Sequence, residues 1–176
     1  MRKHFQQQPD LGVTAIQDVE IPTNSRDQLA PVLRALQTIF VTPSHNQRLF
    51  RILEETVVGD KAATGRTGMD LWAMLVLAVV RHTLDADYDR LHHIANYDSL
   101  VRGVMGVESS TFSRGIQYSI SAVRQNVALL DSSAINGILE IVLEAGQGYL
   151  KKKTGRKFTS RLTLLSWKPM FIIPRT

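Results

Sequence analysis

Three aspartates alternate in the segment DADYD, at Asp85, Asp87 and Asp89, as they do at the start of a calcium-binding loop. Such a loop also requires a glycine at its sixth position and a bidentate glutamate at its twelfth. Those two positions hold Arg90 and Asn96, so the spacing excludes this type of calcium site. The aspartates are instead suited to cap a helix and to interact favourably with its dipole.

Other residues that could bind a metal ion or a phosphate, or react as nucleophiles, also lack the spacing that such a site requires. The adjacent His92 and His93 would point about 100° apart on a helix, so we expect one to be half-buried and the other solvated rather than both to bind one metal ion. The TGRTG segment at 64–68 has neither the lysine nor the preceding strand of a phosphate-binding loop. The chain has no cysteine, which excludes thiolate chemistry. We therefore expect no catalytic residue, metal or cofactor in this chain.

The segment SSTFSRGIQYSISAVRQNV has the pattern of a DNA-recognition helix. Ser109 and Ser110 are typical caps, and an apolar stripe follows at helical spacing. With the helices over 87–105 it would form a helix-turn-helix, whose second helix meets base edges and phosphates near its start. The alternative, an ordinary amphipathic helix on a helical body, is favoured by the pattern alone. The candidate DNA-binding residues are Ser110, Thr111, Ser113, Arg114, Gln117 and, further along, Arg124.

The elements that would position these residues are all helical. Residues 1–24 contain two prolines and a glycine without helical periodicity, so we expect an extended arm. No β-type alternation occurs, and the body from 25 to 153 predicts six or seven helices. Asn24 or Ser25 could cap the first helix, but Pro31 indicates a start nearer Leu29. The predicted helices cover about residues 29–40, 43–57, 69–83, 87–96, 98–105, 110–127 and 132–150.

Positive charge is concentrated at the C-terminal end of the chain. The last 26 residues carry eight Lys or Arg and no acid, whereas the first 150 carry thirteen basic and sixteen acidic residues. Lys151, Lys152 and Lys153 are therefore candidates for phosphate contacts, with a solvated helix end as the alternative. The start of the chain lacks a secretory signal, and its longest apolar run, Leu71–Val80, is too short to cross a bilayer. We expect a cytoplasmic protein, associated with the nucleoid when bound to DNA.

Several blocks resemble the N-terminal region of bacterial insertion-sequence transposases, closest to the group labelled ISNCY. The resemblance is continuous from residue 1 to about 153, and TGRTGMDLW and DYDRLHHIAN are its specific blocks. It implies a helical domain that binds the terminal inverted repeats of the element, with SSTFSR entering the DNA-binding helix. In this family an RNase-H-like domain follows, whose three carboxylates hold two Mg²⁺ and cut and rejoin DNA. The resemblance gives no residue of this chain a catalytic role.

The tail departs from this family. After the lysine run, the family pattern reads roughly Ala-Asp-Ser/Thr-aliphatic-Glu-Thr-Asn-Val-His-Tyr/Phe-Pro-Thr-Asp. The codons that could encode the tail can also be read in the frame one base back, starting at Arg161. In that frame they permit the string ADSFIVETNVHYPTD. Its Glu and Val are forced, because Trp167 and Met170 each have a single codon. We therefore expect an irregular, disordered tail over 154–176, translated out of frame from about residue 162 through a lost base or a ribosomal frameshift.

The sequence thus predicts a DNA-binding fragment of a transposase that recognises terminal inverted repeats and lacks the catalytic domain. Its expected partners are DNA and, in an assembly, a second copy or the full-length transposase, with no membrane and no small-molecule substrate. The alternative is a non-functional helical remnant of a transposase gene with only non-specific affinity for DNA.

Overall fold

The computed structural model describes residues 14–22, 24, 27–58, 68–107 and 116–153, with only the backbone for 148–153. These residues form seven α-helices and no strand, which confirms the predicted all-α fold. The predicted tail over 154–176 lies outside the described residues. The helices are α1 (Leu29–Val41), α2 (Pro43–Leu53), α3 (Leu71–Leu84), α4 (Tyr88–Tyr97), α5 (Ser99–Val104), α6 (Ile120–Val127) and α7 (Ser132–Lys153), with a 3-10 turn η1 (Ile16–Asp18) and a π turn η2 (Glu54–Val58).

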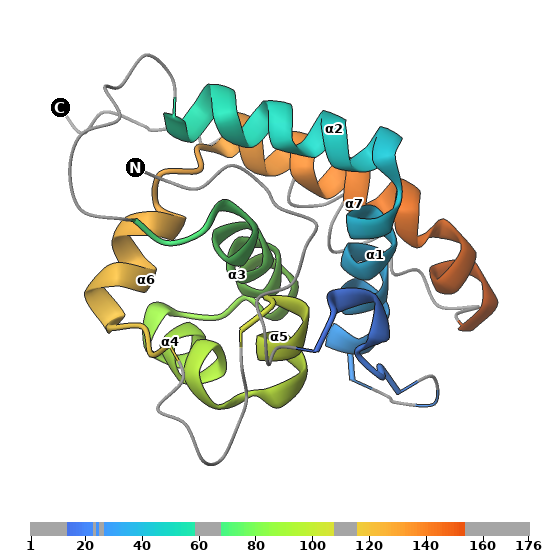
Figure 1. Ribbon diagram of the computed structural model, residues 1–176, viewed down its shortest axis with the longest axis horizontal. Helices are drawn as coiled ribbons and strands as arrows, with labels where there is room; N and C mark the ends of the chain where they lie inside the picture. The colour runs from blue at the N-terminus through green and yellow to red at the C-terminus, as the bar shows by residue number, and fades with distance from the viewer. Residues whose placement is uncertain (1–13, 23, 25–26, 59–67, 108–115, 154–176) are drawn as a thin grey trace, which may run out of the picture.

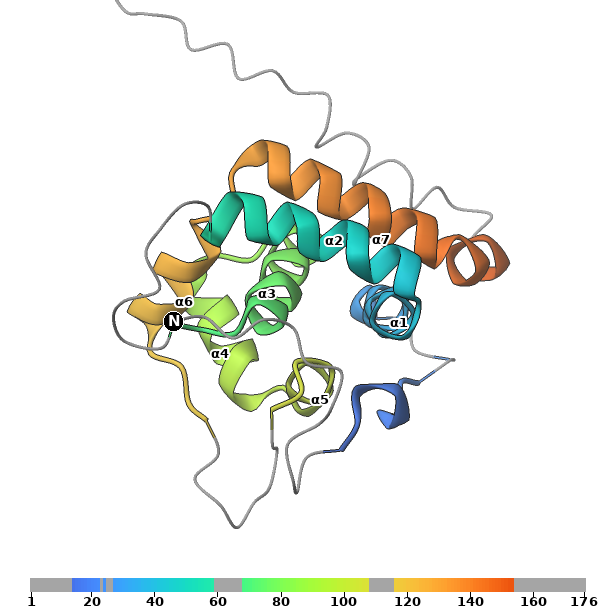
Figure 2. The same ribbon diagram turned by 45° about the horizontal axis from the view of Figure 1, so that its top comes forward.

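Helix α3 is the centre of the fold. It contacts α1, α4, α6 and α7, and in Figures 1 and 2 the helices surround it. Helices α2 and α7 lie side by side on one side of the molecule, whereas α4, α5 and α6 lie on the other. Every residue from Leu71 to Val80 is buried, as expected for a helix that is apolar nearly all round.

Local signals in the sequence explain where most helices begin. Pro43 is the first residue of α2, where its missing N–H costs nothing. Helix α1 begins at Leu29, as Pro31 indicated, and its first N–H donates to the side chain of Asp27. Of the three alternating aspartates, Asp87 caps the start of α4, whereas Asp85 follows the end of α3. Aspartates also cap the starts of α3, α5 and α7 (Asp70, Asp98 and Asp131).

The part of the predicted N-terminal arm that the structure describes packs onto the helical body. Nε2 of Gln37 on α1 lies 2.8 Å from the carbonyl oxygen of Ile16 and 3.0 Å from that of Val19. Arg34, one turn earlier, donates to the carbonyl of Ile21 at 2.9 Å. Ile16 and Ile21 are both buried. The arm therefore contributes to the core even though it contains only one short turn.

Removing the cap of the central helix should measurably destabilise the fold. One carboxylate oxygen of Asp70 accepts hydrogen bonds from the backbone N–H of Trp72 at 2.9 Å and of Ala73 at 3.2 Å. We expect Asp70→Ala to lower the free energy of unfolding by about 1 kcal/mol, as measured by urea denaturation. Asp70→Asn keeps an acceptor at the same position and should recover most of the loss. Equal stability of the alanine variant and the wild type would contradict this role.

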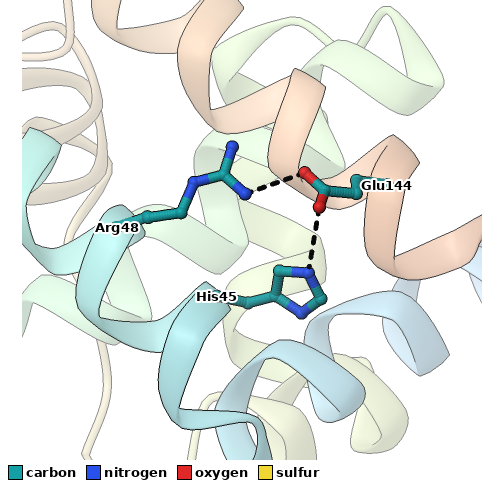
Figure 3. Close-up of polar contacts among 3 residues, drawn as sticks. All are labelled: His45, Arg48 and Glu144. Carbon is teal, nitrogen blue, oxygen red and sulfur yellow. Dashed lines mark hydrogen bonds and ion pairs between the residues drawn. The ribbon is translucent and has the colours of Figure 1, made fainter.

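An ion-pair cluster joins α2 to α7 (Figure 3). Nη1 of Arg48 donates to one carboxylate oxygen of Glu144 at 2.8 Å, and Nε2 of His45 lies 3.5 Å from the other. The hydrogen bond from Arg48 is the main reason that the pKa of Glu144 lies below its usual value, with His45 adding to the effect. The charged form of Glu144 is therefore favoured by folding.

This cluster gives stability a dependence on pH with a defined sign. Because folding lowers the pKa of Glu144, its contribution is complete above the unfolded-state value of about 4.5 and is lost as the pH falls through the folded value. We expect the melting temperature of Glu144→Gln to fall less than that of the wild type between about pH 6 and about pH 3. Glu140→Gln, an exposed position one turn earlier on α7, is the matched control and should follow the wild type.

Candidate nucleic-acid interface

The segment before α6, in which the sequence predicts a recognition helix, has no regular secondary structure over residues 116–118, here called the strap. Asn96 of α4 hydrogen-bonds to both backbone polar groups of Tyr118. The amide of Tyr118 donates to Oδ1 of Asn96 at 2.9 Å, and Nδ2 of Asn96 donates to the carbonyl of Tyr118 at 3.0 Å. A helix would use these same two backbone groups for its own hydrogen bonds, so Asn96 favours a non-helical backbone at Tyr118.

A buried arginine fixes the other end of the strap. Nη1 of Arg102, on α5, donates to the carbonyls of Ala95 and Ile116, both at 3.1 Å. Only 6% of Arg102 is exposed, and a buried guanidinium is tolerated where hydrogen bonds replace its water. Arg102 therefore links α4, α5 and the strap at one point.

The continuous helix predicted from Ser110 to Val127 is wrong over residues 116–119. Helix α6 begins only at Ile120, after Ser119, whose hydroxyl accepts from the amide of Ala122 at 3.2 Å. Val123 and Val127 are buried as the apolar stripe predicts, but Ile116 is 62% exposed. The prediction that Ile116 is buried is wrong because hydrogen bonds to α4 and α5 determine the conformation of the strap. No local sequence pattern indicates these bonds.

The structure describes only part of the predicted interface. Gln117 is exposed on the strap and Arg124 is exposed on α6. Four predicted contacts lie outside the described residues, so a helix-turn-helix is not established; they are Ser110, Thr111, Ser113 and Arg114. The three lysines of the predicted phosphate contact form the last residues of α7, and their side chains also lie outside the described part (Lys151, Lys152 and Lys153).

The structure adds two residues beside Arg124 that sequence reasoning missed. The guanidinium carbon of Arg124 lies 5.4 Å from the centre of the Tyr88 ring, and that of Arg81 lies 4.5 Å from the same ring. Arg81 is in the last turn of α3 and Tyr88 is the first residue of α4. Because the three residues belong to three helices, only the packing of α3, α4 and α6 brings them together.

No protein-family model, curated protein or solved structure matches the chain. The likeness to transposases therefore remains an expectation drawn from the sequence blocks. Among the described helices, none is long and apolar enough by itself to cross a membrane. Helix α6 and Ser132–Gln147 of α7 meet that length and composition only as a pair, and the pair is bent by 89°.

The histidines have the environments that the sequence predicts. His92 is half-buried and His93 is exposed, with the His93 ring 4.9 Å from that of Tyr97. In the part of the chain that the structure describes, no three His, Asp or Glu side chains gather as metal ligands. Burial, followed by the nearby charge of Arg81, lowers the pKa of His82. The lowered pKa of His82 favours its neutral form.

The strap also buries part of a tyrosine beside the central helix. Burial, followed by the charge of Asp70, raises the pKa of Tyr118 to about 12. The phenol is therefore neutral at any physiological pH, which is compatible with its partly buried position against the core. Tyr118 thus holds the strap by packing as well as by its backbone hydrogen bonds to Asn96.

Proposed function

We propose that residues 25–153 form the DNA-binding N-terminal domain of an ISNCY-type insertion-sequence transposase, which recognises the terminal inverted repeats of its element. The two specific blocks support this proposal through their places in the fold. TGRTGMDLW supplies Asp70, the cap of α3, and Trp72, which is buried in the core. DYDRLHHIAN is helix α4 with its cap, and it ends at Asn96, which holds the strap. The resembling residues thus include the cap and core of the central helix and the residue that holds the strap before α6.

The observation that carries the proposal is the rigid support of two predicted DNA contacts. Gln117 and Arg124 are exposed, and the strap that carries Gln117 and leads into α6 is held by Asn96 at Tyr118 and by Arg102 at Ile116. Polar and cationic side chains on a preorganised backbone can set the register of a protein on DNA through phosphates and read bases beside them. Homodimers or assemblies with a full-length transposase are part of the proposal, and catalysis by this chain is not.

The proposal includes the frame change near Arg161. Residues from about 162 onward lie outside the described part, and the support comes from the coding constraints of Trp167 and Met170. Sequencing the gene across codon 161 tests this point directly. A different string in the shifted frame would contradict it and would leave the helical domain untouched.

Binding to DNA is tested with the full chain and two duplexes of equal length and composition. One carries the inverted repeat from the ends of the encoding element, and the other is its scrambled version. We expect tighter binding to the repeat by about tenfold or more, with the preference retained as salt weakens both complexes. Equal, steeply salt-dependent binding to both duplexes would contradict repeat recognition and favour the remnant with non-specific affinity.

The residues outside the described part can be tested in the same assay. Arg114→Ala should abolish most of the preference for the repeat, whereas Arg51→Ala, an exposed arginine on α2, should leave it unchanged. Retained preference in Arg114→Ala would remove Arg114 from the interface without contradicting DNA binding itself.

A further inference from the structure

We propose that Arg81, Tyr88 and Arg124 form a phosphate-binding site at the junction of α3, α4 and α6, here called the Arg81–Arg124 site. The affinity for a phosphate group is argued from the geometry. The assignment of this phosphate to a DNA backbone rests on the proposed function. In Figure 1 these three helices meet on the side of the molecule away from α7.

Neither guanidinium of this site forms an ion pair with a residue that the structure describes. Two guanidinium groups contact one aromatic ring, at 4.5 and 5.4 Å from its centre. In the described residues, the ion pairs found are those of Glu144, and neither arginine shares in them. Two positive groups around a single ring repel each other, and an anion between them would remove that repulsion.

The carboxylates nearest in sequence do not supply this anion. Asp87 precedes Tyr88, but its Oδ1 accepts the amide of Arg90 at 2.8 Å as the cap of α4. Asp85 ends α3 in the left-handed conformation, with φ of 50°, and forms no ion pair with a described residue. Asp85, Asp87 and Asp89 are all exposed, and none of them forms an ion pair with Arg81 or Arg124.

Arg81 is also not held by internal hydrogen bonds. Its Nε atom is buried and has no hydrogen-bond partner, and its contact with Tyr88 is through the face of the ring. A cation on an aromatic face keeps its N–H edges free for another acceptor. Arginine edges match phosphate oxygens in pairs. The ring thus orients the guanidinium, and its terminal amino groups, rather than the buried Nε, are the donors assigned to the anion.

The location of the site deepens the proposed function. Arg124 lies on α6, directly after the strap that carries the exposed Gln117. A phosphate held by Arg81 and Arg124 would fix the backbone of a duplex beside α6, so that side chains from the strap could approach the bases. The site therefore assigns to α3 and α4 a role in positioning DNA, although neither helix carries a DNA contact predicted from the sequence.

The anion itself is tested by NMR on the full chain with ¹⁵N-labelled arginine Nε groups and pyrophosphate as the probe. We expect the Nε signals of Arg81 and Arg124 to shift together with a single affinity, while that of the exposed Arg51 shifts much less. Arg124→Gln should weaken the response of Arg81 by about tenfold, as expected for a shared ligand. Equal shifts of all arginine signals, or no shift at Arg81 and Arg124, would overturn the site.

The source of the phosphate is tested with the scrambled duplex over a range of salt. If both arginines contact one backbone phosphate, Arg81→Gln with Arg124→Gln should reduce the slope of log affinity against log salt by about 0.9, rather than by about twice that amount. Arg51→Gln is the matched control and should keep the wild-type slope. A double variant that binds DNA like Arg51→Gln would overturn the DNA contact.

These outcomes separate the inference from the proposed function. Pyrophosphate shifts without any binding to DNA would retain the phosphate site, assign it to a free phosphate compound, and contradict the transposase proposal. Selective binding to the inverted repeat that does not depend on Arg81 and Arg124 would retain the transposase proposal and overturn the site as its DNA contact.

Discussion

Replacing Trp72 with alanine is expected to cause the largest loss of stability of any single change considered for this fold. The side chain is 3% exposed. Its ring meets Phe40 of α1 edge-on at 5.1 Å and stacks on Phe50 of α2 at 6.4 Å between centres. The indole N–H donates to the carbonyl of Val104, at the end of α5, at 2.7 Å. Trp72 therefore joins α3 to three other helices.

We expect Trp72→Ala to lower the free energy of unfolding by about 3–5 kcal/mol, because it leaves a cavity among these helices and an unpaired carbonyl. This loss is a large share of the about 5–15 kcal/mol that stabilises a typical domain. Urea denaturation followed by far-UV circular dichroism measures it. A loss of less than about 1 kcal/mol would show that the core tolerates collapse around the missing ring.

Two matched variants separate the contributions of Trp72. Trp72→Phe retains an aromatic ring but removes the hydrogen bond to Val104, so we expect a smaller loss of about 1–3 kcal/mol. Trp167→Phe changes the second tryptophan of the chain, in the segment assigned to the other reading frame, and should leave the free energy of unfolding unchanged. A destabilised Trp167→Phe variant would contradict that assignment.

The parts of the fold that could be predicted from the sequence are those fixed by neighbouring residues. Pro43 and the aspartate caps set helix starts within one turn, and the continuous apolar run of α3 identified the central helix. The caps and Pro43 act within about one helical turn, and the apolar run lies within one helix, so a single sequence contains all of the relevant information.

The strap could not be predicted, because its conformation depends on contacts distant in sequence. Asn96 and Tyr118 are 22 residues apart, and Arg102 reaches Ile116 across 14. The local pattern of residues 110–127 favours a helix, and over residues 116–119 tertiary hydrogen bonds override it. The Arg81–Arg124 site was missed for the same reason, since its residues look like ordinary helix-surface positions until three helices pack together.

The second large effect is expected for Arg102, which holds the strap from within the core. Arg102→Met has a similar length but no donor, so the carbonyls of Ala95 and Ile116 lose a buried partner. We expect a loss of about 2–4 kcal/mol in the free energy of unfolding by urea denaturation. Arg102→Lys keeps one cationic donor without the planar geometry of arginine and should give an intermediate value.

If Arg102 positions the strap and α6, its replacement should loosen the strap more than the rest of the domain. A general loss of stability would not have this local effect. Hydrogen exchange of the Tyr118 amide, which is bonded to Asn96, should accelerate in Arg102→Met by more than that of Met74 in the central helix. Asn96→Leu should produce the same local acceleration with a smaller global loss, because it removes the hydrogen bonds at Tyr118 and leaves the buried guanidinium paired. If the strap positions the DNA contacts, both variants should lose preference for the inverted repeat under conditions where they remain folded. Uniform acceleration at both amides would instead show that Arg102 stabilises the whole domain without fixing the strap in particular.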